Sequence, residues 1–321
     1  MIAPPEVLRI QKRKREPDMT AVLIKAVAFV SIIIMGYLLK RAGFFQAKDF
    51  YLVSRIVIKI TLPAAIVSNF SRITMDYSIL FVCVIGFLCN CVTVAVGYMM
   101  YNRRTKAEKA FAMINMSGYN VGNFTMPFVQ SFLSPVGFAA TSLFDAGNAV
   151  MCTGMTYSLA SMVVGEEEKP SVKKVVLKLF SSAPFDAYVI MTVLSILNIK
   201  LPSVLITIAD TAGGANAFLA LLMLGIGFEI RMEKEKMSHI LKILGVRYIL
   251  SVLMAAGFYF LTPFGLDVRR ALVIVSLGPV SSVAPAFTGA LNGDIETASA
   301  INSLSIVISI AAITAALIIL L

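Results

Sequence analysis

The segment 115–127 combines side chains that form hydrogen bonds with residues that interrupt helices. It reads Asn-Met-Ser-Gly-Tyr-Asn-Val-Gly-Asn-Phe-Thr-Met-Pro and lies within a charge-free run over residues 110–144. Inside a membrane an interrupted helix is tolerated only where it is buried in protein or lines a wet cavity, and its freed amides can then bind an anion. We therefore expect Asn120, Asn123, Thr125 and Pro127 to form part of a site for a polar solute. The simpler alternative is that the asparagines only join helices by hydrogen bonds.

A carboxylate and an amide follow this segment one helical turn apart, at Asp145 and Asn148. A charged side chain within a span costs about 2.5–3.5 kcal/mol on insertion scales, and such residues usually line ion or proton paths. Because this spacing places both on one helix face, we expect them to share a proton or a cation. Two alternatives stay open: Asp145 lies near the membrane interface, and Lys59 is either its counter-ion or an interfacial residue. Asp210 offers the same chemistry in a weaker context.

A second segment that is expected to interrupt a helix, residues 278–285, reads Gly-Pro-Val-Ser-Ser-Val-Ala-Pro. Pro127 precedes Asp145 by 18 residues, and Pro285 precedes Asn302 by 17, so polar residues follow both prolines at similar distances. This match indicates that the two segments are equivalent parts of a repeat, although small residues also serve in plain helix packing. The residues of the second segment that we expect to complete the site are Pro279, Ser281, Ser282 and Pro285.

Length and composition identify a polytopic membrane protein whose helices position these groups. Of its 321 residues, 58% are hydrophobic and 14% are charged, which is far from the composition of soluble domains. Because a helix needs roughly 20 apolar residues to cross a membrane, the chain is predicted to be all-α with ten transmembrane helices. These helices cover residues 20–39, 50–70, 77–101, 107–133, 137–164, 179–199, 201–228, 240–261, 271–291 and 297–321. Further interruptions are expected near Pro63 in the second helix and over residues 209–216 in the seventh.

Lysines and arginines lie mainly in the loops after the first, third, fifth and seventh predicted helices. By the positive-inside rule these loops are cytoplasmic and both termini are outside. An odd number of helices in each half makes residues 19–164 and 179–321 a 5+5 inverted repeat, with broken helices 4 and 9 crossing and residues 165–178 as a cytoplasmic linker. The basic tail, residues 1–18, is predicted to be disordered and opposes this orientation; Met19 is an alternative translation start.

The same inventory argues against other classes of protein. Basic residues in short loops account for the net charge of +10 without nucleic acid. The single histidine, His239, lies in a predicted charged loop, so no intramembrane serine or cysteine has a histidine to activate it, and we expect no enzyme. The four cysteines have neither zinc-ligand spacing nor a disulfide framework. We expect no metal and no cofactor beyond a coupling H⁺ or Na⁺.

These features resemble the auxin efflux carrier family of permeases, within the superfamily that includes the bile acid sodium symporters. The resemblance covers about residues 19–321. The motifs that carry it are residues 120–127, residues 278–294, Leu62-Pro63-Ala64, Asp145-Ala-Gly-Asn148 and the serine-rich tenth helix. It implies ten transmembrane helices, external termini and crossing broken helices that hold an organic anion such as auxin, malate or malonate. It also implies that Asn120 contacts the substrate carboxylate and that Pro127 lies near the crossing.

Three features depart from this family pattern. Ser281 and Ser282 stand where many relatives have an asparagine, Gly213 and Gly214 stand where a proline is common, and the central loop is short. The chemistry on the side of the second segment is therefore open. Together, the residues and the resemblance predict a secondary transporter of the cell membrane for a small mono- or dicarboxylate, working by alternating access. Proton or sodium coupling, the direction of transport, a homodimer and a non-transporting ligand sensor of the same fold are left open.

Overall fold

The computed structural model describes residues 19–46, 48–73, 76–165, 172–228 and 234–321, and every regular element in these ranges is a helix. The predicted all-helical fold class is therefore confirmed for this part of the chain. The basic tail and residues 166–171 of the linker lie outside the described residues. Within the described ranges, six helical segments are long and apolar enough to cross a membrane: Thr20–Arg41, Asp49–Phe70, Tyr77–Met100, Ser203–Gly227, Met237–Leu261 and Ile295–Leu320.

These six segments match the first, second, third, seventh, eighth and tenth predicted helices. The fourth, fifth and ninth predicted helices are divided into shorter pieces, and the sixth corresponds to one shorter apolar helix, Ala183–Ile196, so the count of ten stays a prediction. The elements of the first half are α2 (Met19–Arg41), α3 (Asp49–Ile56), η1 (Val57–Thr61), α4 (Leu62–Phe70), η2 (Tyr77–Leu80), α5 (Phe81–Met100), α6 (Lys106–Met116), η3 (Val121–Thr125), α7 (Met126–Phe132), α8 (Pro135–Val150), η4 (Met151–Met155) and α9 (Thr156–Val164).

The second half has fewer elements. They are α10 (Val172–Leu179), α11 (Ala183–Ile196), α12 (Ser203–Gly214), α13 (Asn216–Gly227), η5 (Lys234–Lys236), α14 (Met237–Leu261), α15 (Leu266–Ser276), α16 (Ala284–Ala290) and α17 (Ile295–Leu320). His239 therefore lies in the first turn of α14 and not in a loop as expected, because this helix begins three residues earlier than its apolar run.

The predicted interruptions occur where glycine and proline indicate them, and one further interruption, the π-helical turn η4 with a non-helical Gly154, was not predicted. Between α6 and η3 the chain is extended at Ser117, and Gly118 adopts a φ of 77°, a left-handed conformation that glycine reaches without a steric penalty. Pro63, Pro127 and Pro285 each stand in the first turn of the helix that follows a break or a π-helical turn. There the missing proline N–H leaves no hydrogen bond unmade. The seventh predicted helix is likewise divided, between α12 and α13.

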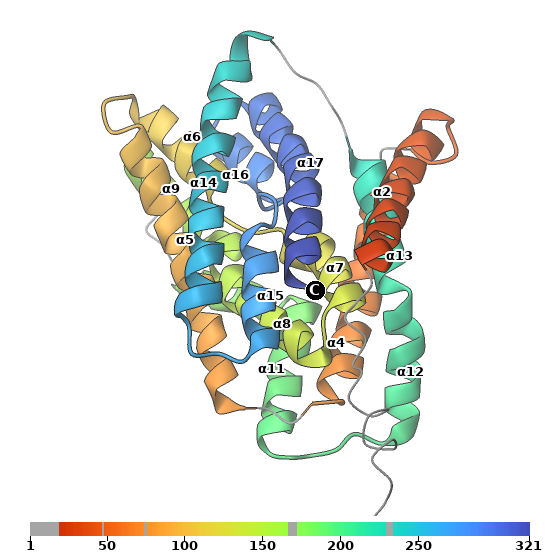
Figure 1. Cartoon of the computed structure of the whole chain (residues 1–321). Coiled ribbons are helices and arrows are strands. Elements are labelled where there is room, and N and C mark those ends of the chain that lie inside the picture. The colour runs from red at the N-terminus through yellow and green to blue at the C-terminus, as the bar shows by residue number, and fades with distance from the viewer. Residues whose placement is uncertain (1–18, 47, 74–75, 166–171, 229–233) are drawn as a thin grey trace, which may run out of the picture.

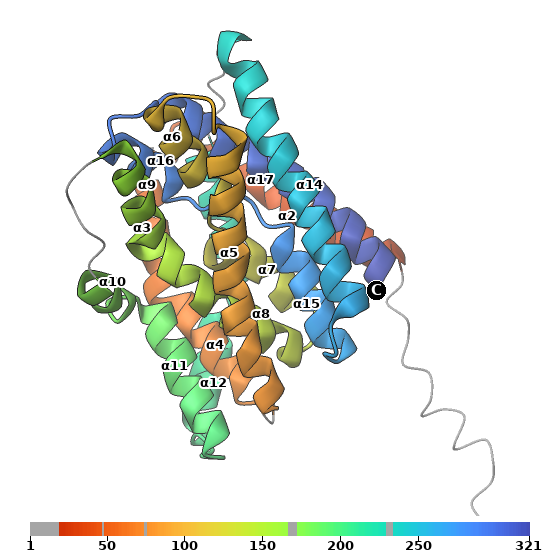
Figure 2. The same cartoon turned by 90° about the vertical axis from the view of Figure 1, so that its left-hand side faces the viewer.

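The helices form two groups, which Figure 1 shows on opposite sides of the molecule. The N-terminal helix α2 lies beside α13, with α12 and α4 below them, whereas α5, α6, α9 and α14 lie on the other side. Both views place α11 and α12 at one end and α6, α9 and α16 at the opposite end (Figures 1 and 2). The α2–α13 contact is close because a Cβ on Gly225 would lie 2.1 Å from the Ile33 carbonyl oxygen. Small residues allow helix backbones to approach in this way inside a membrane.

Candidate functional site

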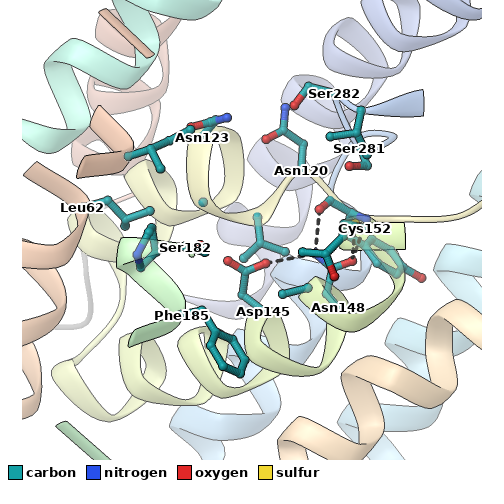
Figure 3. A pocket seen from close by; sticks show the side chains of 18 of the residues that line it. Leu62, Asn120, Asn123, Asp145, Asn148, Cys152, Ser182, Phe185, Ser281 and Ser282 are labelled. Carbon is teal, nitrogen blue, oxygen red and sulfur yellow. Dashed lines mark hydrogen bonds between the residues drawn. The ribbon is translucent and has the colours of Figure 1, made fainter. Parts of the chain in front are cut away.

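A cavity of about 210 Å³ lies where the interrupted segments meet α8 and α11. Figure 3 shows Asn120 and Asn123 on one side of it and Asp145 with Phe185 on the opposite side. No lysine or arginine is among the described residues that line it. The lining residues are Ile58, Leu62, Tyr119, Asn120, Val121, Gly122, Asn123, Asp145, Asn148, Ala149, Cys152, Thr153, Ser182, Pro184, Phe185, Tyr188, Ser281, Ser282 and Val283.

The two interrupted segments contact each other directly beside this cavity. Tyr119 and Val280 form an isolated antiparallel bridge, and the Asn120 N–H donates to the Pro279 carbonyl at 3.0 Å. Backbone groups that the broken helices leave unpaired are thus partly satisfied by the other segment, as burial in a membrane requires. The segments before η3 and after α15 therefore form one structural unit, although about 160 residues of chain separate them.

A side chain from the following helix holds each bridge residue. Asn148 of α8 accepts from the Tyr119 N–H at 3.0 Å and donates to the Tyr119 carbonyl at 2.9 Å. In the second half, Asn302 of α17 donates to the Val280 carbonyl at 3.0 Å, and the Val280 N–H donates to Ser305 Oγ at 3.1 Å. Asn148 and Ser305 follow Pro127 and Pro285 by 21 and 20 residues, and each accepts from the N–H of its bridge residue. The carbonyl contact comes from Asn148 itself in the first half and from Asn302 in the second.

Asp145 lines the cavity without a basic partner. Its Oδ1 accepts from Asn148 Nδ2 at 2.9 Å, and its Oδ2 accepts from the Tyr188 hydroxyl at 3.0 Å. No lysine or arginine in the described ranges pairs with it, and the Lys59 side chain is exposed. A carboxylate held by neutral donors inside a membrane protein can exchange a proton or bind a cation, which are the two roles that the sequence indicates for it.

The two asparagines of the first segment are left with unused hydrogen-bonding capacity. The side-chain oxygen of Asn123 is buried and has no partner in the described part of the protein. The Asn120 side chain is only 5% exposed, and within the described ranges only its backbone groups are hydrogen-bonded. Because buried amides are usually paired, these groups are available for a bound solute.

Six of the predicted site residues line the cavity, and four do not. Asn120, Asn123, Asp145, Asn148, Ser281 and Ser282 line it, whereas Thr125, Pro127, Pro279 and Pro285 lie behind the lining. Thr125 donates through its backbone N–H and its hydroxyl to the Asn120 carbonyl, at 3.2 and 3.3 Å. The prolines begin helices or accept hydrogen bonds at the bridge, so this second group shapes the backbone of the segments that carry the lining residues.

Arg247 and Tyr188 are two neighbours of the site that the sequence analysis did not single out. Arg247 lies in α14 with no exposed surface and donates to carbonyls of both interrupted segments. Like Asp145, it is a charged residue within an apolar run. The cost of placing a charge in a membrane span therefore indicates a functional role for Arg247 from the sequence as well. Tyr188 had no such signal, because a tyrosine in an apolar helix is ordinary.

The comparisons with known proteins agree with this architecture. Residues 21–319 match the membrane transport protein family, and the chain belongs to that family. This confirms the resemblance to auxin efflux carrier permeases that the motifs indicate. The chain is also 21% identical over 284 residues to an uncharacterized transporter of Methanothermobacter thermautotrophicus, with 87% of this chain and 92% of the relative covered. Family and apolar helices together define a multi-pass membrane protein of a transport family.

Proposed function

We propose that this protein is a secondary transporter that carries a small carboxylate across the cell membrane by alternating access. The observation that carries the proposal is the contact of two interrupted helices, through Tyr119 and Val280, beside a cavity whose described lining includes amides, hydroxyls and one carboxylate. Interrupted helices that meet inside the membrane are the usual substrate sites of such transporters. The proposed topology has ten spans in two inverted halves, with both termini outside and the linker in the cytoplasm.

The equivalent hydrogen bonds of the two halves support the inverted repeat. Asn148 holds Tyr119 in the first half, and Asn302 with Ser305 holds Val280 in the second. In both cases the side chain comes from the helix that follows the interrupted one. Such equivalence is expected when two copies of one five-helix unit face each other across the membrane.

Donors from both segments would bind the substrate carboxylate. The side-chain amides of Asn120 and Asn123, the hydroxyls of Ser281 and Ser282, and the first amides of the helix formed by η3 and α7 surround this part of the cavity. The N-terminal amides of a helix favour a negative charge. The cavity volume of about 210 Å³ suits a small solute.

Asp145 would couple this binding to a proton. A carboxylate substrate and an ionised Asp145 would repel each other in a cavity whose described lining includes no lysine or arginine. Protonation of Asp145 removes the repulsion, so that one proton enters with one anion. This coupling follows from the charge of the two groups and does not require any further residue.

Uptake into proteoliposomes tests the proposal. The purified protein is offered labelled mono- and dicarboxylates under an imposed proton gradient, an imposed sodium gradient, or neither. We expect uptake that the proton gradient drives, and Asp145→Asn should abolish this proton-driven uptake. Asp76→Asn is the matched control, because within the described part of the chain Asp76 serves as the cap of η2, which asparagine can also be.

Three results would contradict parts of the proposal. Unchanged pH dependence in Asp145→Asn would remove Asp145 from the coupling role. Uptake driven by sodium alone would make the protein a sodium symporter. Binding of a carboxylate without uptake under any gradient would favour a membrane sensor of the same fold.

A further inference from the structure

Arg247 is a charged side chain enclosed within a helix that is apolar enough to cross a membrane. It lies near the middle of α14 and has no exposed surface. Its Nη1 donates to the Met116 carbonyl, and its Nη2 donates to Gly118 at 2.8 Å and to Gly278 and Pro279 at 3.4 Å each. One guanidinium therefore contacts carbonyls on both sides of the bridge between the interrupted segments.

The contacts of Arg247 are all to neutral acceptors. Among the described residues no carboxylate pairs with it, and its Nε has no partner. Burying an unpaired charge costs several kcal/mol unless other groups compensate for it. The compensation lies in the position of the carbonyls: Met116 ends α6, and Gly278 follows the last turn of α15. The C-terminal end of a helix carries a partial negative charge, so a cation there is stabilised.

The planar guanidinium is suited to joining two chain segments. Its donors form a rigid fork, and hydrogen bonds from a charged donor are stronger than neutral ones. A lysine ammonium in the same place is a compact point charge on a flexible stem and lacks this fork. Only a side chain with several fixed donors can hold Gly118 and Pro279 at the same time in the observed geometry.

The same side chain places a positive charge behind the cavity wall. The guanidinium carbon lies 4.9 Å from the centre of the Tyr119 ring, and Tyr119 lines the cavity. No lysine or arginine is among the described lining residues, so Arg247, which lies behind Tyr119, provides a positive charge close to the cavity without lining it. A charge without solvent exposure is only weakly screened by salt.

We propose that Arg247 is a positioning residue for transport: it holds the ends of α6 and α15 together at the Tyr119–Val280 bridge and provides a fixed positive charge behind the substrate cavity. The part that concerns the substrate rests on the proposed function. The part that concerns the bridge does not, because it depends only on the contacts of Arg247 with the two segments.

Hydrogen–deuterium exchange in lipid nanodiscs tests the positioning role. Arg247→Gln should raise exchange in both interrupted segments, residues 117–120 and 277–282, by about tenfold or more, while α5 stays unchanged. Arg247→Lys should raise exchange in the same two segments by a smaller factor. The control is Arg270→Gln, which removes an arginine–carbonyl contact of α15 with Leu320, away from the bridge; it should match the wild type in both segments.

An increase in only one segment, or in neither, would overturn the positioning role. If Arg247→Gln cannot be recovered as a monodisperse protein, Arg247→Lys decides the question, and exchange equal to that of the wild type would overturn the proposal.

Uptake kinetics test the electrostatic part of the proposal. Arg247→Gln should raise the KM for a carboxylate by about fivefold or more, and Arg247→Lys should restore most of the affinity because it keeps the charge. An unchanged KM in Arg247→Gln would remove the electrostatic role. If the wild type takes up no carboxylate at all, the proposed function fails, and the exchange experiment still decides the role of Arg247 at the bridge.

Discussion

Asn148 binds both backbone groups of Tyr119, accepting from its N–H at 3.0 Å and donating to its carbonyl at 2.9 Å. The second hydrogen of the same amide is donated to Asp145 Oδ1 at 2.9 Å. One side chain therefore connects the bridge between the interrupted segments to the carboxylate in the cavity. A change of charge or of ligand at Asp145 acts on Asn148 and through it on the backbone of Tyr119.

Replacing Asn148 should destabilise the bridge. Asn148→Ala leaves the buried N–H and carbonyl of Tyr119 without this partner, and each unsatisfied buried group costs about 1–3 kcal/mol. We expect a clearly lower midpoint of thermal unfolding in detergent, together with reduced uptake. Asn69→Ala is the matched control, because among the described residues the Asn69 amide binds only the Ala65 carbonyl of its own helix. Equal unfolding midpoints in the two variants would show that the Asn148 contacts stabilise the protein no more than the contact of Asn69 within its own helix.

The contact between α5 and α8 depends on glycine. A Cβ on Gly147 would lie 1.9 Å from the Cys83 carbonyl oxygen, whereas a Cβ on Gly257 in α14 would meet nothing within 4 Å. We expect Gly147→Ala to force the helices apart and to lower stability by about 1–3 kcal/mol, or to prevent recovery of folded protein. Gly257→Ala should be neutral or stabilising by up to about 1 kcal/mol, because alanine favours helices. Thermal unfolding and size-exclusion profiles of both variants provide the comparison.

The sequence predicts the interruptions well because their cause is local. Glycine and proline act on the backbone at their own positions, so the breaks around Gly118 and before Pro285 follow from residue type alone. The partnership of the two segments is also predictable, because the repeat places Asn148 and Ser305 at similar distances from their prolines. These features reflect local chemistry that recurs in both halves of the chain.

The remaining contacts of the site depend on which helices become neighbours. Tyr188 reaches Asp145 because α11 packs against α8, and nothing within either helix indicates this. Arg247 contacts the end of α6, 131 residues away in the sequence, as well as the end of the next helix, α15. Roles that depend on packing between different helices therefore cannot be predicted from the sequence of one helix, even where that helix contains an evident charged residue.

Asp210 illustrates the same limit, because its partner comes from another helix. Its carboxylate pairs with Arg72 at 2.6 Å and accepts from the Ser68 hydroxyl. The Arg72 side chain is 53% exposed and the Asp210 side chain is 37% exposed. Exposed pairs of this kind contribute little to stability, because solvent screens their charges. We expect Asp210→Asn to keep uptake within about twofold of the wild type, with the same pH dependence. Loss of proton-driven uptake in this variant would contradict the assignment of coupling to Asp145.

Asp294 begins α17, where its side chain accepts from the Thr297 N–H at 3.0 Å and pairs with Lys236 at 2.9 Å. Burial raises the pKa of this carboxyl, but the Thr297 and Lys236 contacts outweigh burial and lower the pKa to about 2. In an unfolded chain the pKa is about 3.9. Because the folded pKa is the lower one, the stabilisation is complete above about pH 4 and is lost as the pH falls towards about 2. Solvent screening reduces its size, since the side chain is 40% exposed.

Two variants separate the cap from the charge of Asp294. Asp294→Asn keeps a capping oxygen and loses the charge, whereas Asp294→Ala loses both and should cost about 1 kcal/mol. At about pH 6 we expect thermal midpoints in the order wild type, Asp294→Asn, Asp294→Ala, and at about pH 3 the gap between the first two should narrow while the alanine variant stays lowest. The measurement is the unfolding midpoint of each protein at both pH values. A gap between wild type and Asp294→Asn that does not narrow at low pH would show that the charge of Asp294 is not the source of its stabilising effect.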